Sequence, residues 1–129
     1  MIGVDTNVLA RYFVAEDDAD AATERQRRAA LDLIESGQPL FLAKTVALEL
    51  EQLLQVFDHL LAHPGLTAED RPALEQAVAG VRNGLDFADA LHHASCRSCA
   101  SMASFDDRGF VRRSRQLNLA PRVFVPAGP

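Results

Sequence analysis

The chain has 129 residues, 48% of them hydrophobic, so residues 1–129 are expected to form a single domain with a full hydrophobic core. No apolar run approaches the length of a membrane span, so we expect no transmembrane helix. The opening residues carry no basic stretch and reach Asp5 at once, so we expect no signal peptide and a cytoplasmic location.

The net charge of −5 speaks at first against a nucleic-acid partner, because such proteins usually present basic surfaces. Four metal-bound acids would account for most of that excess negative charge. All basic residues except Lys44 are arginine. Arginine is suited to bidentate contacts with phosphate. Arginine clusters at 25–28 and 112–115 are therefore either phosphate-binding surfaces or solvated helix faces.

Hydrophobic periodicity predicts an alternation of strands and helices along the chain. In chain order these are a strand at 1–4, helices at 8–14 and 18–36, a strand at 39–43, helices at 45–61, 67–82 and 86–97, a strand at 98–103, a helix at 108–117 and a strand at 122–125. Such alternation is typical of a three-layer α/β/α fold with a central parallel β-sheet.

Two cysteines, Cys96 and Cys99, form a C-x-x-C pattern where a helix is expected to lead into a strand. A redox motif has the opposite order, with the strand before it and the helix after it. His92 and His93 lie close enough in sequence to keep a zinc site open. We expect two free thiols that are buried or partly buried, the usual state of free cysteine.

The first half of the chain contains two candidate metal ligands. Asp5 directly follows the first expected strand, and open α/β sheets bind ligands beyond the C-terminal ends of their strands. Asp5 is also suited to cap the next helix, but Thr6 and Asn7 offer capping side chains as well. Glu49 falls on the apolar stripe of its helix, whereas Glu51 is about 200° away and expected to be solvated. Glu49 therefore needs a partner inside the protein.

The second half of the chain contains two more candidates. Asp86 is expected to cap a helix and to serve at most as an outer ligand through water, while Asp89 at the third helical position is the better ligand. His93, one turn later, is either an orienting group for Asp89 or an ordinary boundary residue. Asp106 and Asp107 follow the third strand, whose direction favours Asp106 as the ligand and Asp107 as a helix cap.

Acids that face a core need a partner, because an unpaired buried charge is costly. Several carboxylates together favour Mg²⁺ or Mn²⁺. Two such ions can hold a phosphodiester, activate water and stabilise the leaving oxygen. The sequence has no G-x-S-x-G elbow, P-loop or H-E-x-x-H motif, so metal-assisted phosphodiester hydrolysis is the chemistry that remains.

Four short pieces of sequence match one family, in the same order and across nearly the whole chain. They are VDTNVL at residues 4–9, LEL at 48–50 with Leu53 and Leu54 after it, DFADALH at 86–92, and SFD at 104–106. On these pieces the chain resembles a PIN domain, and most closely the VapC-type toxins of bacterial toxin–antitoxin pairs.

The resemblance implies a parallel sheet flanked by helices and a Mg²⁺-dependent endoribonuclease. It implies an acidic site formed by Asp5, Glu49, Asp89 and Asp106, supported by Thr6, Asn7 and Ser104. Ser104 stands where threonine is commoner in the family and keeps the hydroxyl. The resemblance also implies a homodimer, neutralised by a small antitoxin whose tail enters the groove of the site.

Other functions remain open from the sequence. A phosphatase that forms an aspartyl-phosphate also begins with a strand and an aspartate, but it requires a second acid where Asn7 stands. It also requires a lysine, and the only one is Lys44. The closest alternatives are a PIN-domain nuclease of RNA processing without an antitoxin, and a catalytically silent PIN-like binding module.

Overall fold

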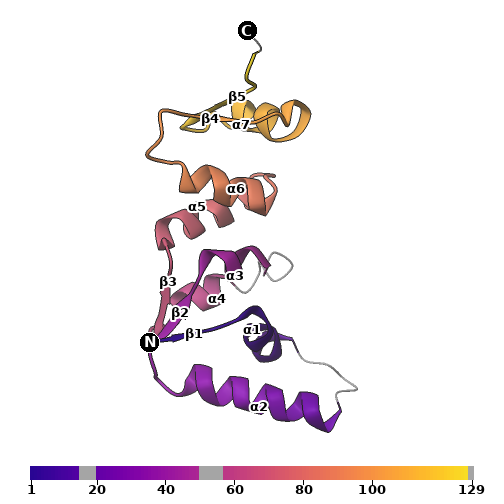
Figure 1. Cartoon of the computed structure of the whole chain (residues 1–129), viewed down its shortest axis with the longest axis vertical. Coiled ribbons are helices and arrows are strands. Elements are labelled where there is room, and N and C mark those ends of the chain that lie inside the picture. The colour runs from indigo at the N-terminus through magenta and orange to yellow at the C-terminus, as the bar shows by residue number, and fades with distance from the viewer. Residues whose placement is uncertain (15–19, 50–56, 128–129) are drawn as a thin grey trace. The chain divides into compact units, whose positions relative to one another are not determined.

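The computed structural model describes residues 1–14, 20–49 and 57–127. The chain divides into two compact units, Met1–Arg71 and Pro72–Pro129, and each is described by itself (Figure 1). Both units combine helices with short parallel strands, so the expected mixed α/β class is confirmed. A single central sheet with helices on both faces stays a prediction, as does the organisation of the chain as one domain.

The first unit is built around a three-stranded parallel sheet of order β1-β2-β3 (Figure 1). Its elements are β1 (Ile2–Gly3), α1 (Thr6–Phe13), α2 (Ala21–Glu35), β2 (Leu40–Leu42), α3 (Lys44–Glu49), α4 (Phe57–Ala62) and β3 (Leu66–Ala68). Leu40 lies opposite Ile2 on one side and Leu66 on the other. Leu40 and Leu42 are buried, so the middle strand carries the core of this unit.

One expected helix start in the first unit is wrong. The sequence pattern predicts a helix from residue 67, but Leu66–Ala68 forms β3 and α5 (Arg71–Arg82) begins only afterwards. The strand forms because each of its residues pairs with a residue of β2, and this tertiary pairing outweighs local helix propensity. Pro72 then stands in the first turn of α5, where its missing N–H costs no helical hydrogen bond.

Several expectations lie outside the described residues. They concern the start of a helix at Asp18, the apolar positions Leu50, Leu53 and Leu54, and the solvated Glu51. Of the helix expected at 45–61, the structure describes α3 and α4.

The second unit contains helices within the three ranges where the sequence predicts them, and a short parallel strand pair. The first of these helices begins later than expected, and the last follows a π-helical turn. The elements of this unit are α5, α6 (Phe87–Ser95), β4 (Ser101–Ala103), a π-helical turn η2 (Asp107–Val111), α7 (Arg112–Gln116) and β5 (Arg122–Phe124). The two strands pair in parallel with Met102 opposite Val123. Its core includes Leu74 of α5, Phe87 of α6 and Val123 of β5. Between α5 and α6 the chain turns at Gly84, whose φ of 97° lies in the region that favours glycine.

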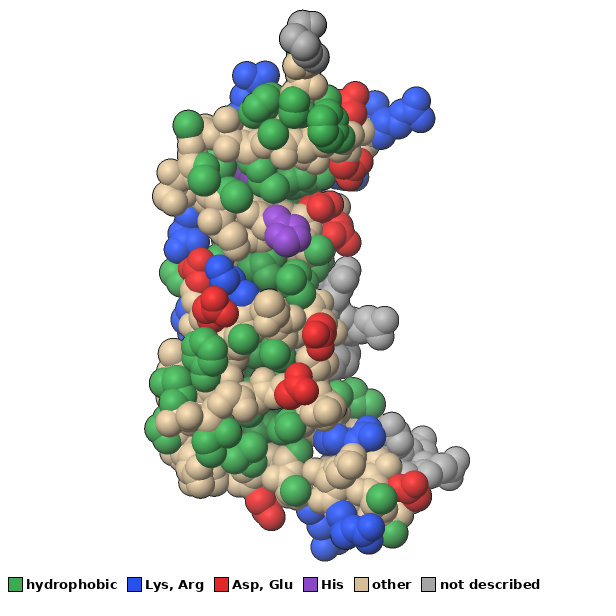
Figure 2. All heavy atoms as spheres, viewed as in Figure 1, with side chains coloured by type: hydrophobic (Ala, Val, Ile, Leu, Met, Phe, Trp, Pro, Cys, Tyr) green, Lys and Arg blue, Asp and Glu red, His purple; other side chains and the backbone are tan. Residues whose placement is uncertain are grey.

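The visible surface of each unit carries acidic and basic side chains with hydrophobic ones between them (Figure 2). Among the described residues, the exposed large hydrophobic side chains are those of Met1, Ile2, Val14 and Phe105. None of the helices in the described ranges has both the length and the apolar character needed to cross a membrane.

Candidate active site

Asp5 lies immediately after β1 and caps α1. Its Oδ1 accepts a hydrogen bond from the backbone N–H of Thr6 at 2.8 Å, and the helix begins at Thr6, two residues earlier than expected. Of the three candidate capping side chains at residues 5–7, the structure thus assigns the cap to Asp5. Because Asp5 is exposed and only Oδ1 accepts a hydrogen bond from the described residues, Oδ2 is available to a ligand.

Glu49 is held beside Asp5 through Thr6. The hydroxyl of Thr6 donates to Oε2 of Glu49 at 2.6 Å, across 43 residues of sequence. This contact follows from the parallel pairing of β1 with β2, because α1 and α3 leave the same edge of the sheet. Glu49 is nevertheless exposed, which corrects the expectation that it faces the core. In α3 the buried residue is Ala47, and Glu49 lies about 200° around the helix from it.

The hydroxyl of Thr6 is expected to orient Glu49 as a ligand. Thr6→Val keeps the side-chain shape but removes the donor, so Mn²⁺ should bind about 10–100-fold more weakly, the usual effect of losing an orienting partner. Thr6→Ser keeps the hydroxyl and should bind nearly as well as the wild type. Titration calorimetry with Mn²⁺ measures both; equal affinities in the two variants would contradict this role.

Asn7 lies one residue further along α1, on the side of α2. It is exposed and lines a pocket of about 560 Å³ together with apolar residues of α2, including Ala30 and Leu33. The structure thus places Asn7 at the groove between α1 and α2. Its supporting role at the acidic site stays a prediction.

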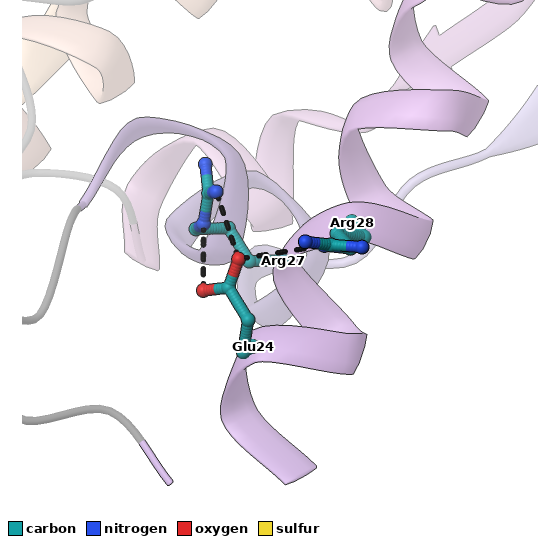
Figure 3. Close-up of polar contacts among 3 residues, drawn as sticks. All are labelled: Glu24, Arg27 and Arg28. Carbon is teal, nitrogen blue, oxygen red and sulfur yellow. Dashed lines mark hydrogen bonds and ion pairs between the residues drawn. The ribbon is translucent and has the colours of Figure 1, made fainter. Parts of the chain in front are cut away.

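The first arginine cluster is largely engaged in ion pairs on α2 (Figure 3). Arg27 binds Glu24 with two nitrogens, at 2.9 and 3.1 Å, and Arg28 Nε lies 3.6 Å from the same carboxylate. The hydrogen bond with Arg27 is the main reason that the pKa of Glu24 is lowered. Pairs one helical turn apart are typical of solvated helix faces, and this interpretation is favoured for residues 25–28.

In the second unit, Asp86 and Asp89 take the positions expected of them. Asp86 is the N-cap of α6, and its Oδ2 accepts from the backbone N–H of Asp89 at 3.2 Å. Asp89 is the third helical residue and is half-buried. Among the described residues, no hydrogen bond or ion pair engages the carboxylate of Asp89.

Asp106, not Asp107, is the capping residue of the turn that follows β4. Its Oδ1 accepts from Gly109 N at 3.0 Å and its Oδ2 from Phe110 N at 3.2 Å. The expectation that Asp107 caps the helix is therefore wrong, because Asp107 is the exposed first residue of η2. Asp106 as the metal ligand stays a prediction. The wide π-helical turn brings two successive amides over the Asp106 carboxylate, and such turns are frequent at functional sites.

Ser104 connects this turn to the strand pair. Its N–H donates to the carbonyl of Phe124 at 2.9 Å, which extends the β4–β5 ladder by one step. Its hydroxyl accepts from the backbone N–H of Asp106 at 3.2 Å. Ser104 therefore fixes the backbone from which the Asp106 side chain projects.

Three of these acids share one pocket, where their negative charges repel one another. Asp86, Asp89 and Asp106 line a pocket of about 480 Å³ in the second unit. Burial raises the pKa of Asp89, the charges of Asp86 and Asp106 raise it further, and His92 opposes them. The ionised form of Asp89 is thus disfavoured in this pocket, and a bound cation would reverse that effect.

Gly109 is required by the way Asp106 caps the turn. A Cβ at this position would lie 2.7 Å from Oδ2 and 2.8 Å from Oδ1 of Asp106, closer than real Cβ contacts. Gly109→Ala should therefore displace the carboxylate, remove its two amide hydrogen bonds and destabilise the fold by about 1–3 kcal/mol. Urea unfolding measures this loss; Arg108→Ala in the same turn is the control, and equal stability in both would contradict the clash.

His93 has a structural partner within the second unit. It is buried, its Nε2 lies 2.8 Å from the carbonyl oxygen of Pro121, and its ring packs edge-on against Phe110. His93 thus ties α6 to the segment that leads into β5. That it also orients Asp89 stays a prediction.

Both cysteines are free thiols. Cys96 is half-buried, as expected, whereas Cys99 is exposed. Burial raises the pKa of the Cys96 thiol, and Cys99 raises it further. A redox-active cysteine needs the opposite shift, so the pattern does not favour redox chemistry.

The two units each contribute part of the expected site. Asp5, Thr6 and Glu49 belong to the first unit, whereas Asp89, Asp106 and Ser104 belong to the second. Among residues 1–14, 20–49 and 57–127, no three His, Cys, Asp or Glu side chains are grouped closely enough to hold a metal ion. The joint site of four acids therefore stays a prediction.

Sequence reasoning missed the backbone amides of Gly109 and Phe110, which donate hydrogen bonds to Asp106. The glycine three residues after Asp106 was the one signal of this turn in the sequence.

Comparisons of the chain with protein-family models, curated proteins and solved structures found no match.

Proposed function

We propose that this protein is a metal-dependent endoribonuclease that cleaves RNA phosphodiester bonds. The observation that carries the proposal is the half-buried Asp89, which shares a pocket with Asp86 and Asp106. Burial and the charges of these two acids raise the pKa of Asp89. The order of Asp5, Glu49, Asp89 and Asp106 along the chain supports it, as does the hydrogen bond that holds Glu49 next to the Asp5 cap.

The donor set suits a hard cation. All four acids offer carboxylate oxygens, the ligands that Mg²⁺ and Mn²⁺ prefer. When bound, such an ion activates water and stabilises the leaving oxygen of a phosphodiester. The protein's own part is positioning: Thr6 directs an oxygen of Glu49, and the η2 amides and Ser104 fix Asp106.

Cleavage of RNA by purified protein tests this proposal. We expect cleavage with Mg²⁺ or Mn²⁺, none in excess EDTA, and none from Asp5→Ala. Asp32→Asn, which removes an exposed charge from α2, is the matched control and should remain active. Full activity in EDTA, or an active Asp5→Ala variant, would refute the proposal.

We further propose that the enzyme is the toxin of a toxin–antitoxin pair, works in the cytoplasm as a homodimer, and is neutralised by a small antitoxin. The resemblance to VapC-type toxins supports this part. Induced expression should arrest growth, and co-expression of a small protein from the neighbouring gene should relieve the arrest. Active nuclease that leaves growth unaffected would instead favour a PIN nuclease of RNA processing.

A further inference from the structure

The pocket that holds three acids in the second unit is also lined by three arginines. Arg108 belongs to η2, and Arg112 and Arg113 belong to α7; these three are named the arginine wall. Within the part of the chain that the structure describes, none of the three guanidinium groups forms an ion pair or a side-chain hydrogen bond. Opposite charges thus line one pocket without pairing with each other.

Arginines outside this pocket have different surroundings. On α2, Arg27 and Arg28 close on the nearest carboxylate, Glu24 (Figure 3). On α7 itself, Arg115 lines a different pocket, beside Arg122. Within the described residues, Arg115 and Arg122 likewise form no ion pair or side-chain hydrogen bond, so the wall is distinguished by its place in a pocket that also holds three acids.

One member of the wall lies beside the turn at Gly84. The guanidinium carbon of Arg113 lies 3.6 Å from where a Cβ of Gly84 would be, and its Nη1 and Nε lie at 3.7 and 3.8 Å. These are ordinary van der Waals separations, so the guanidinium of Arg113 lies beside the turn, two residues before Asp86. Arg113 is exposed, and its donors form no side-chain hydrogen bond within the described residues, so they are available to a ligand.

We propose that the arginine wall binds a phosphate of the RNA chain next to the phosphate that is cleaved. This inference rests on the proposed function, in which Asp89 and Asp106 hold the metal. Arginine binds phosphate through paired N–H donors, and such charge-assisted hydrogen bonds are stronger than neutral ones. The wall also offsets the repulsion between RNA and the pocket's acids, so a chain of net charge −5 can still bind a polyanion locally.

RNA binding by the metal-free protein tests the wall without requiring cleavage. The probe is a fluorescein-labelled single-stranded RNA oligonucleotide in EDTA, followed by anisotropy at several salt concentrations. Arg112→Gln/Arg113→Gln should bind more weakly, and its slope of log K against log salt should be shallower by about 0.7 for each phosphate that the variant no longer neutralises. Arg115→Gln, on the same helix but outside the pocket, should match the wild type.

Conservative variants separate charge from geometry. Arg112→Lys/Arg113→Lys keeps both charges but loses the planar fork, so its affinity should lie between those of the wild type and the glutamine variant. Circular dichroism checks that each variant is folded. If the glutamine variant does not fold, the lysine variant decides: wild-type affinity in it would overturn the proposed contact.

The outcomes for the wall and for the proposed function are distinguishable. If RNA is never cut but the glutamine variant still shows weaker binding and a shallower salt dependence, the wall stands and the nuclease proposal fails. If RNA is cut while the glutamine variant binds no more weakly than Arg115→Gln, the wall is refuted and the nuclease proposal stands. With both correct, the glutamine variant should raise KM more than it lowers kcat.

Discussion

Asp89→Asn is expected to abolish metal-dependent RNA cleavage and, at neutral pH, to make the metal-free protein more stable. If Asp89 is a metal ligand as proposed, its removal should lower metal affinity by more than the roughly 10–100-fold that the loss of an orienting partner costs. The stabilisation has a separate cause. Burial and the charges of Asp86 and Asp106 disfavour ionised Asp89, and they thereby raise its pKa. Asparagine carries no charge and avoids that repulsion.

The raised pKa of Asp89 also determines how the stability of the folded protein changes with pH. The pKa of Asp89 in the folded protein lies above its ordinary value of 3.8. The stability linked to this group is fully present below the unfolded-state pKa and is lost as the pH rises through the folded-state pKa. The variant should therefore match the wild type at pH values below 3.8 and exceed it above the folded-state pKa.

Urea unfolding with and without Mn²⁺ measures both effects. Mn²⁺ at about 100 times its dissociation constant should stabilise the wild type by about 2.7 kcal/mol and leave Asp89→Asn unchanged. Asp89→Asn should thus be the more stable protein without metal, and the wild type should be the more stable one with Mn²⁺. Asp32→Asn, which changes an exposed acid on α2, should behave as the wild type does. A metal-free Asp89→Asn variant less stable than the wild type would contradict the charge repulsion.

The caps show which parts of the site were predictable. The N-cap position of Asp86 and the third helical position of Asp89 were predictable, because Asn83 and Gly84 mark a break and the next helix begins in the ordinary way. The capping role of Asp106 does not, because sequence rules assume α-helical turns. The π-helical turn depends on Gly109 leaving room for the carboxylate, and that contact is visible only in three dimensions.

Among the contacts between distant segments, some were also predictable from the sequence and others were not. The proximity of Thr6 to Glu49 was predictable, because residues that follow neighbouring parallel strands share one edge of a sheet. Strand β3 was not, since residues 67–69 have a local composition typical of a helix start. The exposure of Glu49 was also missed, because periodicity over a long helix gave a different phase from that of short α3.

Truncating a buried side chain in either unit is expected to lower stability strongly. Phe87 of α6 is 1% exposed and Leu42 of β2 is fully buried. Because the surroundings of a deleted core side chain relax only partly, Phe87→Ala should cost about 3–5 kcal/mol and Leu42→Ala about 2–5 kcal/mol. Urea unfolding measures both, with Asp32→Asn again as the surface control.

The same two variants test whether residues 1–129 unfold as one domain. The chain has one tyrosine and no tryptophan, and Tyr12 of α1 packs edge-on against Phe13 in the first unit. Tyrosine fluorescence therefore reports on the first unit, whereas circular dichroism reports on the helices of both. If the chain is a single cooperative domain, Phe87→Ala in the second unit must shift the Tyr12 transition as far as the dichroism transition. A Tyr12 transition that Phe87→Ala leaves in place, while Leu42→Ala moves it, would show two independently folding parts.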